Sequence, residues 1–215
     1  MILEIDNVEL YFKNKSILNG IYLKAETGKV TGILGRNGAG KSCLFEVAFG
    51  TLKSKYKLVR IDGNPILKPL YQTGKVKYLP QYHFVPKGYK LKTLFKTYSV
   101  NWDNFITQFP SFTNLENQRF DTFSGGEKRL IEVFIILKSD SEIIFLDEPF
   151  SHLAPLHIET IKDLIQSEKA NKIIVISDHM YEHIIAMSDT IYLLKNGWTK
   201  LIDNVSELQD YQYLS

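Results

Sequence analysis

The chain lacks several features that would place it outside the cell or within a membrane. One cysteine, Cys43, occurs in 215 residues, so an intrachain disulfide is excluded and a reducing compartment is expected. No apolar run approaches the roughly 18 residues that a membrane-spanning helix needs, and residues 133–137 form about the longest one. The opening MILEIDNVEL carries acidic residues early and lacks the basic-then-apolar pattern of a signal peptide. We therefore expect a cytosolic protein, which can still dock on a membrane protein.

An excess of charge of one sign is also missing. The chain has 26 Lys and Arg residues against 24 Asp and Glu residues, which gives a formal net charge of +2. A charge so balanced gives no reason to expect nucleic acid as a partner. A hydrophobic content of 44% and a length of 215 residues are typical of one soluble domain with a sizeable core.

The order of apolar and polar residues predicts an α/β fold. Alternation within the first 30 residues predicts short strands, and the turn at residues 62–65 predicts a hairpin between residues 57–61 and 66–67. After Gly125 the pattern predicts alternating elements: helix 130–137, strand 143–146, helix 158–165, strand 173–176, a further helix and strand 191–194. Strands that alternate with helices and are apolar on both faces predict a mostly parallel sheet covered on two sides.

Residues 82–123 differ from the rest of the chain in their aromatic content. They hold eleven of the 27 Phe, Trp and Tyr residues. We interpret this segment as an inserted, mostly helical lobe within a single domain, whose core comprises residues 1–81 and 124–215.

The stretch GRNGAGKS, from Gly35 to Ser42, follows an apolar strand at residues 30–34 and precedes a helix expected over residues 41–49. It is a full match to the Walker A pattern. Glycines let successive backbone N–H groups turn inward as a nest for phosphate oxygens, and the helix adds the positive end of its dipole. Lys41 can neutralise the β- and γ-phosphates, and the Ser42 hydroxyl can ligate Mg²⁺. The alternative is a plain glycine turn between a strand and a helix.

Two carboxylates follow the apolar strand at residues 143–146. Strand ends of a parallel sheet point at the ligand crevice. Asp147 can therefore hold the Mg²⁺ shell, while Glu148 polarises an attacking water. A solvated strand end is the alternative.

The stretch Ser124-Gly125-Gly126-Glu127 opens a predicted helix, and two interpretations of it stay open. Ser124 and Glu127 fit a capping box, in which each side chain satisfies a free backbone N–H group. The two glycines would also let a phosphate approach the start of the helix. His179, which follows the strand at residues 173–176, is by itself more often a packed or solvated residue than a catalytic one.

Taken together, these motifs resemble the ATP-binding-cassette (ABC) ATPase family over nearly the whole chain. Their order agrees with that family: aromatic Tyr11 and Phe12, then GRNGAGKS, YLPQY with Gln81, the signature-like FSGGE, IIFLDE and SDHM. The resemblance implies a P-loop NTPase fold of the ABC type. Such a domain has a mostly parallel core sheet, an antiparallel β subdomain and an inserted helical subdomain.

The resemblance also implies roles for individual residues. Phe12 would stack on adenine, Gln81 would link Mg²⁺ and the γ-phosphate to the helical lobe, and His179 would grip the γ-phosphate. Catalysis would involve Glu148, His179 and Gln81. The residues expected to bind ATP are Phe12, Asn37, Gly38, Ala39, Gly40, Lys41, Ser42 and Cys43, joined by Ser124, Gly125 and Gly126 acting on the ATP of a partner cassette. Those expected to hold Mg²⁺ are Ser42, Gln81 and Asp147.

The chain departs from the family pattern after the second carboxylate. Relatives usually show Ser-Ala-Leu-Asp there, whereas this chain has Ser-His-Leu-Ala at residues 151–154. Ala154 thus replaces the carboxylate that normally couples the two sites of a dimer. Glu127 and Phe123 are milder changes, at positions where glutamine and leucine are usual.

Cys43 stands where threonine is common in the family. A thiol in the first turn of a helix can act as a redox switch, but a small buried residue is the favoured interpretation. Two histidine pairs, His152 with His157 and His179 with His183, lack the third ligand that a zinc site would need.

We therefore predict the ATP-hydrolysing subunit of a transporter, which uses ATP and Mg²⁺. It would pair with a second cassette and drive a separate transmembrane permease from the inner, cytoplasmic face of the cell membrane. Residues 82–123 lie where the family docks its membrane partner, although filling of a small core accounts for most of their aromatics.

Two alternatives belong to other functional classes. Soluble ABC proteins that act on ribosomes or DNA resemble tandem cassettes or cassettes split by coiled coils, and this chain has neither feature. A module that holds ATP without hydrolysing it is favoured only by Ala154, and Glu148 and His179 argue against it.

Overall fold

A computed structural model describes residues 1–211 and 213, and a six-stranded sheet forms its centre. The strand order is β10-β9-β3-β8-β7-β6, and all neighbours are parallel except β9 and β10. The strands are β3 (Val30–Leu34), β6 (Val76–Leu79), β7 (Ile143–Asp147), β8 (Ile173–Ser177), β9 (Thr190–Lys195) and β10 (Trp198–Ile202). The prediction of a mostly parallel sheet is confirmed, with one antiparallel strand at its edge.

Both faces of this sheet are covered, as the apolar strands predict. Alternate residues of β7 show why: Ile144 and Leu146 belong to one buried cluster, and Ile143 and Phe145 to another. The first cluster includes residues of the helices α4 (Gly125–Lys138), α5 (Pro155–Glu168) and α6 (Tyr181–Met187). The second includes α1 (Lys41–Phe49) and a second sheet. Because side chains alternate along a strand, a strand apolar at every position needs a partner on each face.

The second sheet is antiparallel and has the order β2-β1-β4-β5. Its strands are β1 (Ile2–Phe12), β2 (Lys15–Glu26), β4 (Tyr56–Ile61) and β5 (Asn64–Pro65). The predicted hairpin exists, but its second strand is Asn64–Pro65 and not residues 66–67. Asp62 and Gly63 form the turn with positive φ angles of 49° and 77°, as a two-residue hairpin requires. After Ile66 the chain turns away from the sheet and leaves Leu67 94% exposed.

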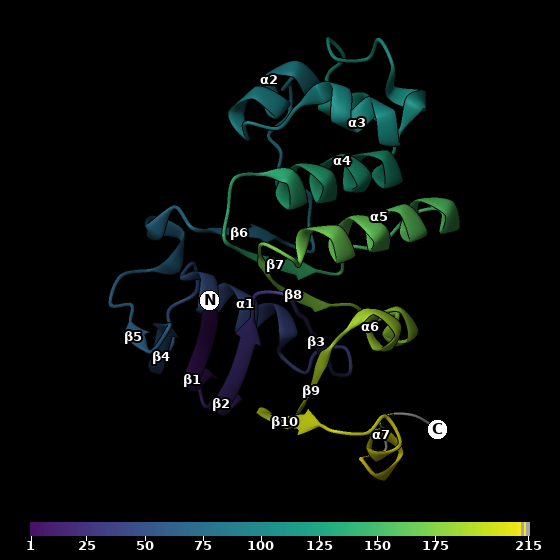
Figure 1. The fold of residues 1–215 in the computed structure, drawn as a ribbon. Coiled ribbons are helices and arrows are strands. Elements are labelled where there is room, and N and C mark those ends of the chain that lie inside the picture. Colours follow the sequence, from purple (N-terminus) through teal and green to yellow (C-terminus); the bar gives the residue numbers. More distant parts are fainter. Residues whose placement is uncertain (212, 214–215) are drawn as a thin grey trace.

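Residues 82–123 contain two short helices, α2 (Leu91–Thr97) and α3 (Trp102–Gln108), and two 3₁₀ turns, η2 (Pro110–Phe112) and η3 (Phe120–Thr122). Figure 1 shows α2 and α3 above α4, with α5 beside α4. Six of the eleven aromatics here are buried: Phe95, Phe105, Phe109, Phe112, Phe120 and Phe123. Their cluster continues without a break onto the helical face of the central sheet. The division into core and lobe therefore stays a prediction.

The last described helix is α7 (Glu207–Asp210), which follows β10. A further 3₁₀ turn, η1 (Leu70–Thr73), precedes β6. Among the described residues, no helix is both long and apolar enough to cross a bilayer.

Phe105 is the aromatic side chain on which the packing of α3 depends most directly. It is fully buried and contacts the rings of Phe95, Trp102 and Phe134 among others. We expect Phe105→Ala to lower the free energy of unfolding by about 3–5 kcal/mol, because the lost ring leaves a cavity. Tyr82→Ala, at an aromatic residue 67% exposed, serves as the control and should change it by less than about 0.5 kcal/mol. Urea denaturation of both variants measures the difference, and equal effects would contradict the packing argument.

Candidate nucleotide-binding site

The GRNGAGKS stretch runs from the carboxyl end of β3 through a loop into the first turn of α1. A cavity of about 790 Å³ opens beside it. Gly38 and Gly40 adopt positive φ angles of 81° and 106°, so the loop uses a backbone conformation that favours glycine. The cavity is lined by Phe12, Ile17, Asn37, Gly38, Gly40, Lys41, Ser42, Cys43, Gln81, Glu148, Ser151, His152 and His179. Residues from five separate predicted motifs thus meet around one space.

Lys41 is the cation of this cavity and is only 6% exposed. Its Nζ donates to the carbonyl oxygens of Gly35, at 2.7 Å, and of Arg36, at 3.4 Å. Burial lowers the pKa of Lys41, and the carboxylates of Glu148, Asp147 and Asp178 oppose that shift. The ammonium therefore lies among acidic groups, at the wall of the cavity.

Asp147 ends β7 directly beneath the first turn of α1. Its carboxylate accepts hydrogen bonds from the Ser42 hydroxyl and from Ser177 Oγ, the latter at 2.8 Å. Tyr78 donates to it at 3.4 Å. Burial raises the pKa of Asp147, and its two serine partners act in the opposite direction. The carboxylate and the Ser42 hydroxyl are therefore adjacent, and their shared role in holding Mg²⁺ stays a prediction.

Glu148 holds the next position with a positive φ of 51°, which is a strained conformation for a non-glycine residue. This conformation directs the carboxylate to the cavity, where Gln81 Nε2 donates to its Oε2 at 2.9 Å. Ser151 Oγ donates to the same oxygen at 3.3 Å, and His179 Nδ1 lies 3.7 Å from it. Gln81, Glu148 and His179 come from three different segments, and the fold brings all three together.

The donor set around the loop fits both a phosphate chain and Mg²⁺. Phosphate oxygens need backbone N–H groups and a cation, which the loop and Lys41 supply. Mg²⁺ prefers hard oxygen ligands, and Ser42, Gln81 and Asp147 each have an oxygen atom at this edge of the cavity or next to it. The exposed ring of Phe12 lies at the cavity's rim, where a base can stack.

Ser124, Gly125 and Gly126 do not line this cavity. Ser124 caps α4 through a complete capping box with Glu127, so that interpretation of the sequence is confirmed. Gly126 packs against the backbone of His152, since a Cβ there would lie 2.6 Å from the His152 carbonyl oxygen. A Cβ on Gly125 would meet nothing within 4 Å. Space is therefore open beside Gly125 and filled beside Gly126.

A family model described as ABC transporter matches residues 18–151, which is more than half of the chain. The chain belongs to the ABC transporter family. A solved structure of an ATP-binding subunit of an ABC transporter has the same fold, with a TM-score of 0.79 at 18% identity, over 99% of this chain and 94% of the other. A nucleotide-free ATP-binding cassette from an ABC transporter gives a TM-score of 0.76 at 23% identity, over 97% and 94%.

Proteins of similar sequence are also described as ATP-binding proteins of transport systems. An uncharacterized ABC transporter ATP-binding protein of Methanocaldococcus jannaschii is 25% identical, over 99% of this chain and 82% of its own length. The branched-chain amino acid transport ATP-binding protein BraG of Pseudomonas aeruginosa is 25% identical, over 91% and 89%. The lipopolysaccharide export system ATP-binding protein LptB of Haemophilus influenzae is 24% identical, over 91% and 88%. The protein is therefore an ATP-binding ABC cassette.

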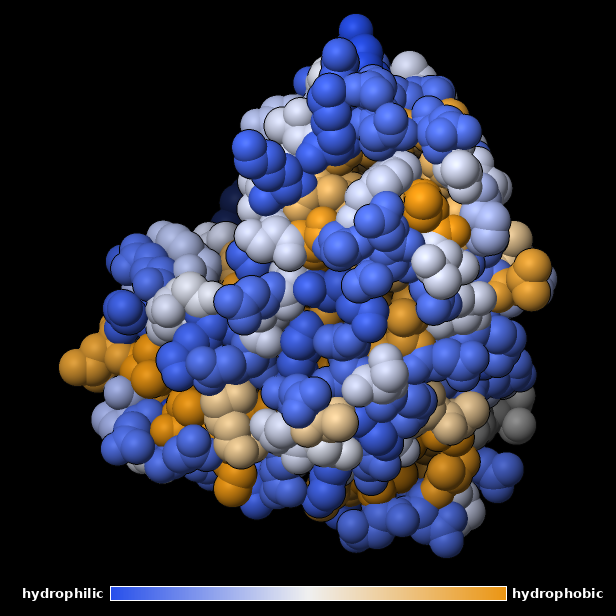
Figure 2. Space-filling view, turned by 45° about the horizontal axis from the view of Figure 1, so that its top comes forward, coloured by the Kyte–Doolittle hydropathy of each residue, from blue (hydrophilic) through white to orange (hydrophobic). Residues whose placement is uncertain are grey.

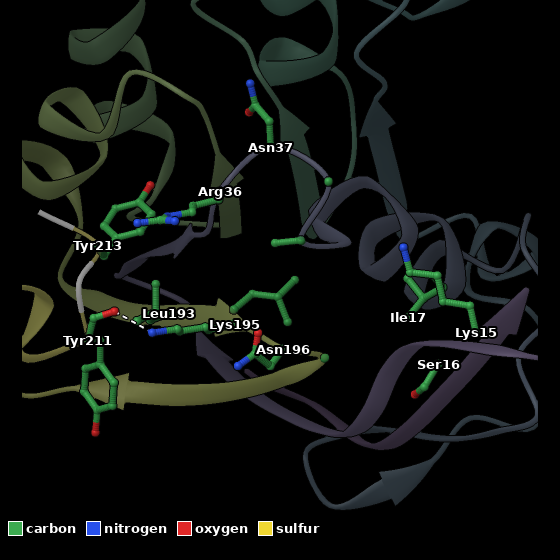
Figure 3. Close-up of a pocket in the computed structure, with 14 residues that line it drawn as sticks. Lys15, Ser16, Ile17, Arg36, Asn37, Leu193, Lys195, Asn196, Tyr211 and Tyr213 are labelled. Atoms are coloured by element: carbon green, nitrogen blue, oxygen red, sulfur yellow. Dashed lines mark hydrogen bonds between the residues drawn. The ribbon is translucent and has the colours of Figure 1, made fainter.

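A second cavity, of about 440 Å³, lies beside the same loop (Figure 3), and Ile17, Asn37 and Gly38 line both cavities. Ala39 lines this second cavity and not the first, and its N–H donates to the Arg36 carbonyl within the loop. Its predicted contact with ATP stays a prediction. Lys195 donates to the Tyr211 carbonyl at 2.6 Å, and the Gly35 N–H donates to the Tyr213 hydroxyl. Tyr213 thus contacts the first residue of the loop, and Tyr211 is held to β9.

The departures from the family pattern have local explanations. Ala154 is the N-cap of α5 and forms no side-chain cap, where an aspartate would satisfy a free N–H group.

Cys43 is half-buried, and burial raises the pKa of its thiol, which favours the small buried residue over the redox switch. The rings of His157 and His183 pack edge-on against Phe109 and Phe150. Among the described residues, no three His, Cys, Asp or Glu side chains are placed to hold a metal ion.

Sequence reasoning missed two buried charged residues of the site. Asp178 is fully buried and accepts from the N–H groups of Phe150, at 3.1 Å, and Met180, at 2.9 Å. Arg129 donates to the carbonyl oxygens of Pro80 and Glu148 at 2.7 and 2.8 Å, and also to that of Asp147. The sequence contains an indication of the buried Arg129, because this arginine and Glu132, three residues later, interrupt an otherwise apolar stretch of helix.

We expect Lys41→Ala to abolish ATP binding or to weaken it severely, because the cavity would lose its buried cation. Lys57→Ala is a matched control, since that lysine also donates to a carbonyl, that of Val47, but lies outside the cavity. Calorimetry with Mg²⁺ present measures both affinities. Unchanged affinity in the Lys41 variant would contradict the assignment of the loop as a phosphate site.

Proposed function

We propose that this cassette is the ATP-hydrolysing subunit of an ABC transporter, working on a separate membrane permease. One observation carries the proposal: Gln81 hydrogen-bonds the carboxylate of Glu148 in the nucleotide cavity, and its neighbour Tyr82 lies in a surface groove. Of two consecutive residues, Gln81 thus lies in the nucleotide cavity and Tyr82 lies at a surface where a partner can bind.

ATP would lie along the loop with its base on Phe12 and its phosphates against the N–H groups of residues 37–43 and Lys41. Ser42, Asp147 and Gln81 would hold Mg²⁺, which neutralises charge on the phosphates. Glu148 would orient the attacking water and accept its proton. His179, whose Nδ1 lies 3.2 Å from Asp178 Oδ1, would contact the γ-phosphate.

Two cassettes would bind each other head to tail around ATP. The open side of Gly125 supports this arrangement, because backbone N–H groups at the start of α4 would be free to meet the γ-phosphate of the partner's ATP. The dipole of the fourteen-residue helix α4 favours an anion at that end.

The groove for the permease has a volume of about 420 Å³. It is lined by Glu46, Phe49, Thr51 and Leu52 from the end of α1 and by Tyr78, Pro80, Tyr82 and Phe84 around Gln81. Of the aromatics in residues 82–123, only Tyr82 and Tyr89 are exposed, so core filling accounts for most of that content. A helix of the permease seated on Tyr82 would change the position of Gln81, and through it the water-orienting Glu148. The cassette would then sit at the cytoplasmic face of the membrane through its permease.

Glu148→Gln tests the hydrolytic part of the proposal. We expect ATP binding to persist and turnover to stop, because the amide fills the same space but cannot accept the proton of water. The variant with ATP should elute as a dimer on gel filtration. Glu142→Gln, at a surface carboxylate paired with Lys75, is the control and should hydrolyse ATP at the normal rate. Absence of hydrolysis in the unaltered protein with its permease would favour an ATP-holding module.

Tyr82→Ala tests the permease groove. Tagged cassette purified from membranes should carry an integral membrane protein, which peptide mass spectrometry identifies, and the variant should lose it. Tyr89→Ala is the control, because that exposed tyrosine of the same segment lies outside the groove. Both variants should bind ATP normally. Recovery of ribosomal proteins or DNA in place of a membrane protein would favour the soluble alternative.

A further inference from the structure

Beside the proposed permease groove, the cassette has a surface that its nucleotide chemistry does not use. It consists of Lys53, Lys55 and Tyr56, after α1, and of Leu67 and Lys68, after β5; we name these five residues the basic edge. A cavity of about 450 Å³, lined by residues 50–57 and Pro69, joins the two segments. Gly50 packs closely on Pro69, since a Cβ on Gly50 would lie 2.6 Å from the proline Cβ. The two segments therefore form one continuous surface.

The lysines of the basic edge are exposed and largely unpaired. Among the described residues, the side chains of Lys53 and Lys68 have no hydrogen bond or ion pair. Lys55 Nζ lies 3.5 Å from Glu9 Oε2 and above the rings of Tyr11 and Tyr56, at 5.4 and 5.1 Å from their centroids. The edge thus presents positive charge that one carboxylate offsets only in part.

Apolar groups are exposed next to these lysines. Leu67 is 94% exposed, more than any other large apolar side chain described, and Tyr56 is 53% exposed. Figure 2 shows hydrophobic and hydrophilic side chains side by side at the left of the molecule, where β4 and β5 lie in Figure 1. Lysine, tyrosine and an aliphatic side chain together suit a lipid headgroup region. The ammonium groups meet anionic headgroups, tyrosine lies at the interface, and leucine enters the acyl boundary.

The basic edge is also continuous with the permease groove, because Thr51 and Leu52 line both the groove and the cavity of the edge. A permease bound in the groove holds the neighbouring surface close to the bilayer. The permease itself belongs to the proposed function, on which the placement of this surface at the bilayer rests.

We propose that the basic edge binds the surface of a membrane containing anionic phospholipids and so supports the cassette on the bilayer beside its permease. Nucleic acid suits the surface less well, because phosphate contacts make no use of an exposed leucine and the whole chain carries a net charge of only +2.

Sedimentation of the purified chain with lipid vesicles tests the proposal. We expect binding to vesicles of phosphatidylcholine with phosphatidylglycerol, weakening as salt is added, and little binding to phosphatidylcholine alone. Lys53→Gln combined with Lys68→Gln should lower the affinity on the order of tenfold. Lys53→Arg combined with Lys68→Arg should keep it, and Leu67→Ser should weaken it.

The matched control is Lys92→Gln combined with Lys96→Gln on α2, two exposed lysines that also lack ion pairs in the described part of the chain. It changes the net charge equally and should bind vesicles as the unaltered protein does. Equal loss in this control, or equal binding to uncharged vesicles, would overturn the proposal. Tighter binding to duplex DNA than to anionic vesicles at the same salt, lost in the Lys53 and Lys68 variant, would overturn it as well. No permease enters this test, so its failure would leave the result of the Tyr82 experiment standing.

Discussion

The buried guanidinium of Arg129 ties together the three segments on which the nucleotide site depends. It is 2% exposed and donates to the carbonyl oxygens of Pro80, Asp147 and Glu148. A cation that has lost its hydration must be hydrogen-bonded, so these carbonyls cannot separate from it without a large cost. The start of α4, the Gln81 segment and the end of β7 are therefore held in one arrangement. Glu132, one turn further, accepts from the Phe84 N–H at 2.9 Å and fixes the same segment.

Carboxylates outnumber cations around Lys41. Lys41 faces three carboxylates, those of Asp147, Glu148 and Asp178, and burial raises the pKa of both aspartates. Parallel strands force this crowding, because β7 and β8 end side by side at the same edge, and each is followed by acidic residues. A divalent cation bound here would offset such an excess. The strained backbone of Glu148 is kept by its bonds to Ser177 and Arg129.

The residue after Gln81 lies at the surface of the cassette. Tyr82 points to a groove, while the preceding proline and the following residues are held by Arg129 and Glu132. The segment is thus held on both sides of Gln81, and the groove is its exposed face. The basic edge lies beyond the same groove and extends the surface on which a membrane partner would be recognised.

The sequence by itself determined the features that depend on neighbours within a few residues. The strand, glycine loop and helix over residues 30–49, the capping box of Ser124 and Glu127, and the apolar strands β7 and β8 follow from local backbone preference and periodicity. Only the tertiary structure decided which distant groups meet. Burial of Arg129 and Asp178, the short β5 with exposed Leu67, and the position of Ala39 on the second cavity all depend on contacts between segments far apart in the chain. Hydration and charge pairing are properties of the folded surroundings, and a linear pattern of residue types does not contain them.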